Sequence, residues 1–129
     1  MTEIGYKVED VSANPDYWYK DIDFLVTSGA TGARKSFEVK WDSRINSTGN
    51  LYLELTNIHS KEGRGWFNFC EADFLAYGDA LAQCFYIIPF AALKERVTNS
   101  QRRRYAQCGS DSTGLLVSIA EIEDLIQIL

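Results

Sequence analysis

Histidine and cysteine are scarce in this chain of 129 residues. His59 is the only histidine, so a histidine-rich zinc site is excluded, and a Ser-His-Asp or Cys-His triad would depend on that one residue. The cysteines, Cys70, Cys84 and Cys108, are odd in number and widely spaced, which fits neither a disulfide framework nor a CxxC metal clip. We therefore expect reduced thiols, as in a cytoplasmic protein.

Long apolar stretches are also lacking. No window approaches about 18 consecutive apolar residues, the length that a transmembrane helix requires. The N-terminal stretch MTEIGYKVED carries acids where a secretion signal has a basic and then an apolar segment. The sequence therefore predicts neither a membrane span nor a secretion signal.

Positive charge is in deficit, because Lys and Arg total 13 against 18 for Asp and Glu, for a formal net charge of −5. This balance is opposite to that of a typical nucleic-acid-binding protein, so any such binding has to use local basic groups. The candidate groups are Arg34 with Lys35, Lys61 with Arg64, Lys94 with Arg96, and the run Arg102, Arg103 and Arg104.

The chain does have enough apolar residues for a core. With 129 residues and 46% apolar content, it is long enough for one domain and too short for two. We therefore expect a single domain over residues 1–129.

A β-hairpin is the clearest local pattern. Residues 21–26 and 35–41 both alternate in polarity, and the turn residues of 28–32 separate them. The alternation predicts that Phe37, Val39 and Trp41 enter the core, while Glu38 and Lys40 lie on the other face.

The hairpin also predicts a cluster of charged side chains. A turn centred on residues 30 and 31 sets Asp23 opposite Glu38 and Asp21 opposite Lys40. Because directly opposed residues have Cβ atoms about 5 Å apart, two or three carboxylates and one lysine would gather on one face.

A third strand is predicted over residues 51–55, after the turn residues of 48–50. Its leucines would enter the core and would leave Tyr52 and Glu54 on the other face, where Glu54 is a candidate to join the cluster. Farther on, we expect a short helix capped by Asn68, a fully buried strand over 84–88, a helix over 90–97, a loop over 98–113, a strand over 115–119 and an amphipathic helix over 120–129. The fold class is α/β, an α+β arrangement with a mixed sheet, in which a central hairpin and meander are flanked by short helices.

An acid on one strand and Glu-x-Lys on the next resembles the PD-(D/E)XK nuclease superfamily, which includes restriction enzymes and Holliday-junction resolvases. The segments DFLV, FEVKWD, TGNLYLEL, EADF and FYIIPFAALKE are similar to a small branch of that superfamily associated with phages and bacteria. The resemblance covers residues 21–97 and implies a restriction-endonuclease-like core, an endonuclease acting on DNA, and a location in the bacterial or phage-infected cytoplasm.

The resemblance also implies roles for single residues. Asp23 and Glu38 would bind Mg²⁺, for which Mn²⁺ can substitute, with the backbone carbonyl of Val39 as a supplementary ligand and Asp21 as a further candidate. Lys40 would be the motif lysine, which orients or deprotonates the attacking water and neutralises the phosphate. The supporting residues would be Asn50 and Glu54. Independently of the resemblance, the local positive charge makes Lys61, Arg64, Arg102, Arg103 and Arg104 the candidates to contact DNA.

Two other interpretations of the same residues stay open. The family usually adds a glutamate from an N-terminal helix, and here only Glu3, Glu9 and Asp10 are available, so a catalytically silent protein that binds nucleic acid or another protein is one alternative. The other is an α/β domain in which Glu38 and Lys40 form an ordinary ion pair. If the chain is a nuclease, we expect a homodimer, because two active sites are needed to cut both strands.

Overall fold

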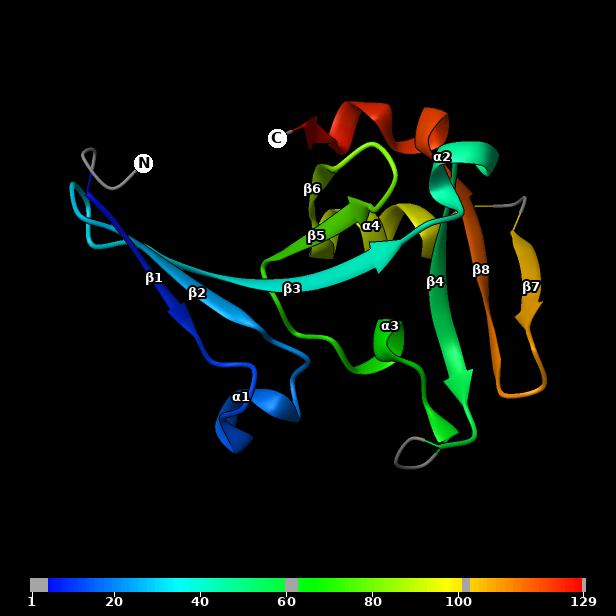
Figure 1. The fold of residues 1–129 in the computed structure, drawn as a ribbon, viewed down its shortest axis with the longest axis horizontal. Coiled ribbons are helices and arrows are strands. Elements are labelled where there is room, and N and C mark those ends of the chain that lie inside the picture. Colours follow the sequence, from blue (N-terminus) through cyan, green and yellow to red (C-terminus); the bar gives the residue numbers. More distant parts are fainter. Residues whose placement is uncertain (1–4, 60–62, 101–102, 129) are drawn as a thin grey trace.

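The computed structural model of the chain describes residues 5–59, 63–100 and 103–128. It is a mixed α+β structure, rich in sheet, with few and short helices (Figure 1). The larger sheet, sheet A, has the strand order β1 (Tyr6–Asp10), β2 (Phe24–Ser28), β3 (Arg34–Asp42), β5 (Phe74–Asp79), β6 (Cys84–Pro89) and β9 (Gln127–Ile128). Sheet B has the order β4 (Asn50–Asn57), β8 (Ser112–Ser118) and β7 (Arg104–Cys108). The helices are α1 (Pro15–Trp18), α2 (Ile45–Thr48), α3 (Trp66–Phe69), α4 (Phe90–Thr98) and the 3₁₀ helix η3 (Ile119–Leu125).

The predicted hairpin is confirmed, including its register. Strands β2 and β3 are antiparallel, and Phe24 lies opposite Phe37, as the predicted register requires. Immediately before β2, the Asp23 amide donates a hydrogen bond of 2.8 Å to the Phe37 carbonyl, so the pairing extends to the predicted acid. The turn includes Gly32 at φ +73°, a conformation that glycine adopts without steric cost.

The core lies between sheet A, sheet B and α4. Strand β3 runs parallel to β5, and β5 runs antiparallel to β6, so sheet A is mixed. Leu75 of β5, Ile88 of β6 and Leu93 of α4 are fully buried and belong to one apolar cluster with Leu51 and Leu53 of β4. The prediction that the β4 leucines enter the core is confirmed for these two, and Leu55 packs partly buried against the same cluster. Figure 1 shows α4 behind β5 and β6.

The prediction for the two faces of β3 is wrong. Glu38 is only 2% exposed, whereas Trp41, which was expected in the core, is 60% exposed. Phe37 and Val39 are half-buried. Alternation shows which residues share a face, but the face that becomes covered depends on elements far along the chain, here α3 and sheet B.

Several other elements differ from the prediction. Strand β1 and strand β7 were not predicted, because both are short strands with mostly exposed residues and no clear alternation. Helix α3 is capped by Gly65 and not by Asn68. Strand β6 is half-buried except at Ile88. The C-terminal segment is helical only to Leu125, where the chain turns into β9 and pairs with β6.

Helix α4 and the strand β8 confirm the predicted helix over 90–97 and the predicted strand over 115–119, with shifted ends. Among the described residues, no helix has the length and apolar character needed to cross a membrane.

Candidate functional site

Three segments bring the predicted charged residues together. Glu38 and Lys40 lie on β3, with side chains on its covered face, and Asp23 comes directly before β2. Asp21 lies two residues earlier and has a positive φ of 55°, a conformation that aspartate tolerates better than most residues. The Cys70 thiol donates to the Asp21 carbonyl at 3.7 Å, which ties this bend to the chain after α3.

The lysine amine lies between two carboxylates. Lys40 Nζ is 3.3 Å from Glu38 Oε1 and 3.6 Å from Asp21 Oδ2. Asp23 has a different partner, since its Oδ2 accepts a hydrogen bond of 2.9 Å from the Val39 amide. The predicted gathering of acids and lysine on one face is therefore found for Asp21, Glu38 and Lys40. Asp23 holds β3, the strand that carries Glu38 and Lys40.

Trp66 of α3 covers this cluster. Lys40 Nζ lies 5.0 Å from the centre of the Trp66 ring, within the range of a cation–π interaction. Trp66 itself was not predicted as part of the site. The structure shows why a glycine precedes it, because a Cβ atom at Gly65 would lie 2.5 Å from the Glu54 carbonyl oxygen. Only glycine lets α3 approach β4 this closely, and that approach places the Trp66 ring beside the lysine.

Two oxygens of the cluster lack hydrogen bonds. Among the described residues, Asp21 Oδ2 and Glu38 Oε2 are buried without a hydrogen-bond partner. Leaving a buried polar atom unsatisfied costs about 1–3 kcal/mol, and more if it is charged. Lys40 offsets part of this cost, because its ammonium faces Asp21 Oδ2 itself at 3.6 Å and Glu38 Oε1 at 3.3 Å. Among the described residues, Glu38 Oε2 has no such ion pair.

Burial controls the protonation of the cluster. It raises the pKa of the Glu38 carboxyl to about 10; the Lys40 ammonium opposes this rise, while the adjacent Asp21 and Asp23 carboxyls add to it. Burial also raises the pKa of Asp21, again against the effect of Lys40. For Lys40, burial alone would lower the pKa, but the carboxylates of Glu38 and Asp21 outweigh it and raise the pKa of the amine. Lys40 is therefore a charged ammonium at neutral pH.

The donor set fits a divalent cation that keeps most of its water. In the described part of the chain, no group of three or more His, Cys, Asp or Glu side chains is arranged to hold a metal ion. Mg²⁺ does not need such a group, since it is commonly held by one or two carboxylates and retains several waters. The buried unsatisfied oxygens of Asp21 and Glu38 are carboxylate oxygens of the kind that Mg²⁺ and Mn²⁺ prefer.

The other residues predicted to support the site lie outside the cluster. Glu54 accepts hydrogen bonds from Ser112 Oγ at 3.1 Å and from Asn57 Nδ2 at 3.3 Å, so the expectation that it joins the acids is not met. Asn50 Oδ1 instead accepts a hydrogen bond of 3.0 Å from Arg104. Both side chains link strands within sheet B: Glu54 links β4 to β8, and Asn50 links β4 to β7.

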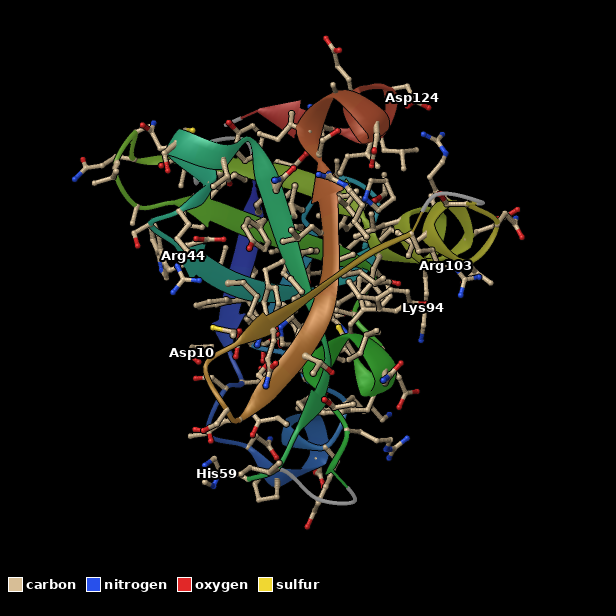
Figure 2. The ribbon with its side chains drawn as sticks, turned by 90° about the vertical axis from the view of Figure 1, so that its right-hand side faces the viewer. Asp10, Arg44, His59, Lys94, Arg103 and Asp124 are labelled. Atoms are coloured by element: carbon tan, nitrogen blue, oxygen red, sulfur yellow. The ribbon has the colours of Figure 1, made fainter. Side chains whose placement is uncertain are left out.

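The basic residues do not form one patch. Arg103 donates to the Thr98 carbonyl, and Arg64 forms an isolated β-bridge with Thr56. In Figure 2, Arg44 lies on one side of β8, whereas Lys94 and Arg103 lie on the other. The remaining two residues predicted to contact DNA, Lys61 and Arg102, lie outside the described residues.

A pocket of about 390 Å³ opens beside Lys40. It lies between the end of β3, β4 and β7, and the side chains that line it include Lys40, Arg44, Tyr52, Trp66, Tyr77 and Gln107. A larger pocket of about 620 Å³, lined in part by Arg96, Arg103 and Arg104, contains none of the clustered acids. The smaller pocket therefore provides access to the lysine end of the cluster.

A comparison of the chain with protein-family models, curated proteins and solved structures finds no match. The functional argument therefore rests on the geometry and chemistry of the cluster formed by Asp21, Asp23, Glu38 and Lys40.

Proposed function

We propose that the chain is a metal-dependent endodeoxyribonuclease with a restriction-endonuclease-like core, which hydrolyses phosphodiester bonds of DNA. The observation that carries this proposal is the Lys40 ammonium held between the carboxyl groups of Asp21 and Glu38, where Glu38 is buried and its Oε2 has no hydrogen-bond partner among the described residues. Such an arrangement is costly for stability, so a role in chemistry accounts for it better than a role in folding.

The acids would hold the cation. Asp21 and Glu38 are the ligands that the buried oxygens favour, and the Val39 carbonyl remains a proposed supplementary ligand. Bound there, Mg²⁺ or Mn²⁺ would activate water and stabilise the negative charge that develops on the phosphate. Asp23 is assigned a positioning role, because its carboxylate holds the Val39 amide and so fixes the strand between Glu38 and Lys40.

Lys40 would act through its charge. Since the adjacent carboxylates raise its pKa, the amine donates protons in hydrogen bonds and does not serve as a general base at neutral pH. It is 28% exposed on the side of the 390 Å³ pocket, where a phosphate group can approach it. The ammonium then neutralises the phosphate and orients the attacking water, while the Trp66 ring keeps the amine in place.

The DNA partner would reach the site through the pocket beside Lys40. Arg44 supplies a second positive charge in its wall, and Tyr52 supplies aromatic surface. These groups can contact backbone and bases locally, which a chain of net charge −5 requires. A homodimer belongs to the same proposal, because one such domain carries one site and duplex cleavage needs two.

Cleavage of supercoiled plasmid, single-stranded DNA and branched DNA in Mg²⁺ or Mn²⁺ tests the proposal. We expect cleavage that is lost on addition of a chelator and reduced at least about 100-fold by Lys40→Met or Glu38→Gln. The matched control is Glu54→Gln, which changes an acid of β4 outside the cluster and should retain activity. Cleavage that survives both cluster substitutions would contradict the proposal.

One observation favours a second function, a catalytically silent protein that binds nucleic acid or another protein. The Lys40 amine already neutralises both carboxylates by ion pairs, as it would in a site that has lost its cation. Binding of labelled DNA without cleavage in either metal, unaffected by Glu38→Gln, would support this function instead.

A further inference from the structure

One face of sheet A is apolar and open. Directly opposed residues of neighbouring strands share a face, and the registers place Val8 beside Val26, Phe24 beside Phe37, and Phe37 beside Phe74. Phe37 and Phe74 stack with their ring centroids 5.2 Å apart. Trp41 and Phe85, with ring centroids 4.6 Å apart, continue the same face at the end of β3. We call this surface the open face of sheet A.

The side chains of the open face are poorly covered. Val8 is 62% exposed, Trp41 is 60% exposed and Tyr6 is 42% exposed, while the aromatic residues between them are half-buried. By contrast, Leu25, Leu75 and Ile88 on the other face of the same strands are buried in the core. A contiguous exposed apolar surface across neighbouring strands is typical of an interface rather than of a solvated sheet.

The charges of the open face are self-complementary. On the strands of this face, within the described residues, the charged side chains are Asp10 of β1 and Lys35 of β3. They have opposite signs and are separated by β2. A two-fold axis that lies in the interface plane, midway between these two side chains, brings Asp10 of one copy toward Lys35 of the other, twice, and leaves apolar residues to meet apolar residues.

We propose that the open face of sheet A packs against the same face of a second copy of this chain. Two sheets that pack face to face interdigitate the side chains of their inner faces. Trp41 is the expected anchor, since tryptophan is enriched among the residues that contribute most to protein–protein binding. Glu38 and Lys40 lie on the opposite face of β3, and Trp41 also lines the pocket beside Lys40, so the interface would border the entrance to the candidate site.

This inference gives the homodimer of the proposed function an interface, but it rests on sheet A alone and holds whether or not the protein is a nuclease. The mass of the protein in solution, by sedimentation velocity over a dilution series without metal or DNA, tests it directly. We expect a dimer whose Kd rises at least about 100-fold in Trp41→Lys and in Val8→Lys, because each substitution buries an unpaired ammonium. Circular dichroism establishes that each variant remains folded.

The matched control is Ile58→Lys, which adds the same charge at a side chain that is 68% exposed in the segment after β4, away from the open face. It should leave the Kd unchanged. A charge exchange then tests the orientation: Asp10→Lys and Lys35→Asp should each weaken the dimer at least about tenfold, and the double variant should restore it. A monomer at every concentration, or a dimer insensitive to Trp41→Lys and Val8→Lys, would overturn the proposal.

Discussion

Replacing Glu38 by glutamine should make the metal-free protein more stable. Glutamine keeps the shape of the side chain and removes the carboxylate that burial disfavours, and its amide can donate to the unsatisfied Asp21 Oδ2. Because the raised pKa leaves Glu38 protonated at neutral pH, Lys40 keeps its ion pair with Asp21, at 3.6 Å, and exchanges a neutral carboxyl at 3.3 Å for an amide. Satisfying a buried oxygen gains about 1–3 kcal/mol, and a weaker contact of the amide with Lys40 offsets part of it, so we expect a net gain of about 1–2 kcal/mol.

The gain should depend on pH. The pKa of Glu38 is raised in the folded protein, to about 10, so the folded state holds a proton that the unfolded state releases. The stabilisation from this proton is complete below the unfolded pKa of about 4.5 and is lost as the pH rises toward the folded pKa. The free energy of unfolding of the wild type should therefore fall over this range, and that of Glu38→Gln should fall less.

Urea unfolding of both proteins at several pH values, with a chelator present, measures this difference. In thermal unfolding, a gain of 1 kcal/mol corresponds to about 4 °C in Tm for a domain of this size. The control is Glu54→Gln, in which a hydrogen-bonded acid outside the cluster is removed and no gain is expected. Parallel stability curves for wild type and Glu38→Gln, or a less stable variant at pH 8, would refute the reasoning.

Three further outcomes are expected. Mn²⁺ at 100 times its Kd should increase the free energy of unfolding of the wild type by about 2.7 kcal/mol and so raise its Tm. The Tm of Glu38→Gln should not change. Gly65→Ala should lower the free energy of unfolding in urea by about 2 kcal/mol or more, since its Cβ would lie 2.5 Å from the Glu54 carbonyl oxygen; an unchanged midpoint would contradict this. Tyr77→Phe should lower the free energy of unfolding by about 1–2 kcal/mol in the same assay, because the buried hydroxyl donates to the Asp42 carboxylate and accepts from the Tyr52 amide of β4. An unchanged free energy of unfolding would show that this link is dispensable.

The hairpin was predictable because two local signals agree. The turn residues of 28–32 and the alternation on both sides of them set the same register, which places Asp21 near Lys40. The face that is buried was not predictable from the same pattern. The buried face is decided by Trp66, which lies against Lys40, and by the core leucines of β4. Both come from segments that follow the hairpin in the chain.

The remaining errors have a shared cause, which is dependence on distant partners. Strand β1 forms by pairing with β2, and β7 by pairing with β8, although their own residues are mostly exposed and lack a clear period. The apolar stripe predicted for residues 120–129 suits a helix, yet the chain after Leu125 pairs with β6 as β9. At the site, the hydrogen bond from the Val39 amide to the Asp23 carboxylate likewise depends on the pairing of two strands.

Calorimetric titration of the protein with Mn²⁺ tests the central claim most directly, namely that the acids beside Lys40 form a cation site. The account predicts binding of one ion per chain in the wild type and in Glu54→Gln, and its loss in Glu38→Gln and in Asp21→Asn. Absence of binding in the wild type, or binding that persists in both cluster variants, would contradict it.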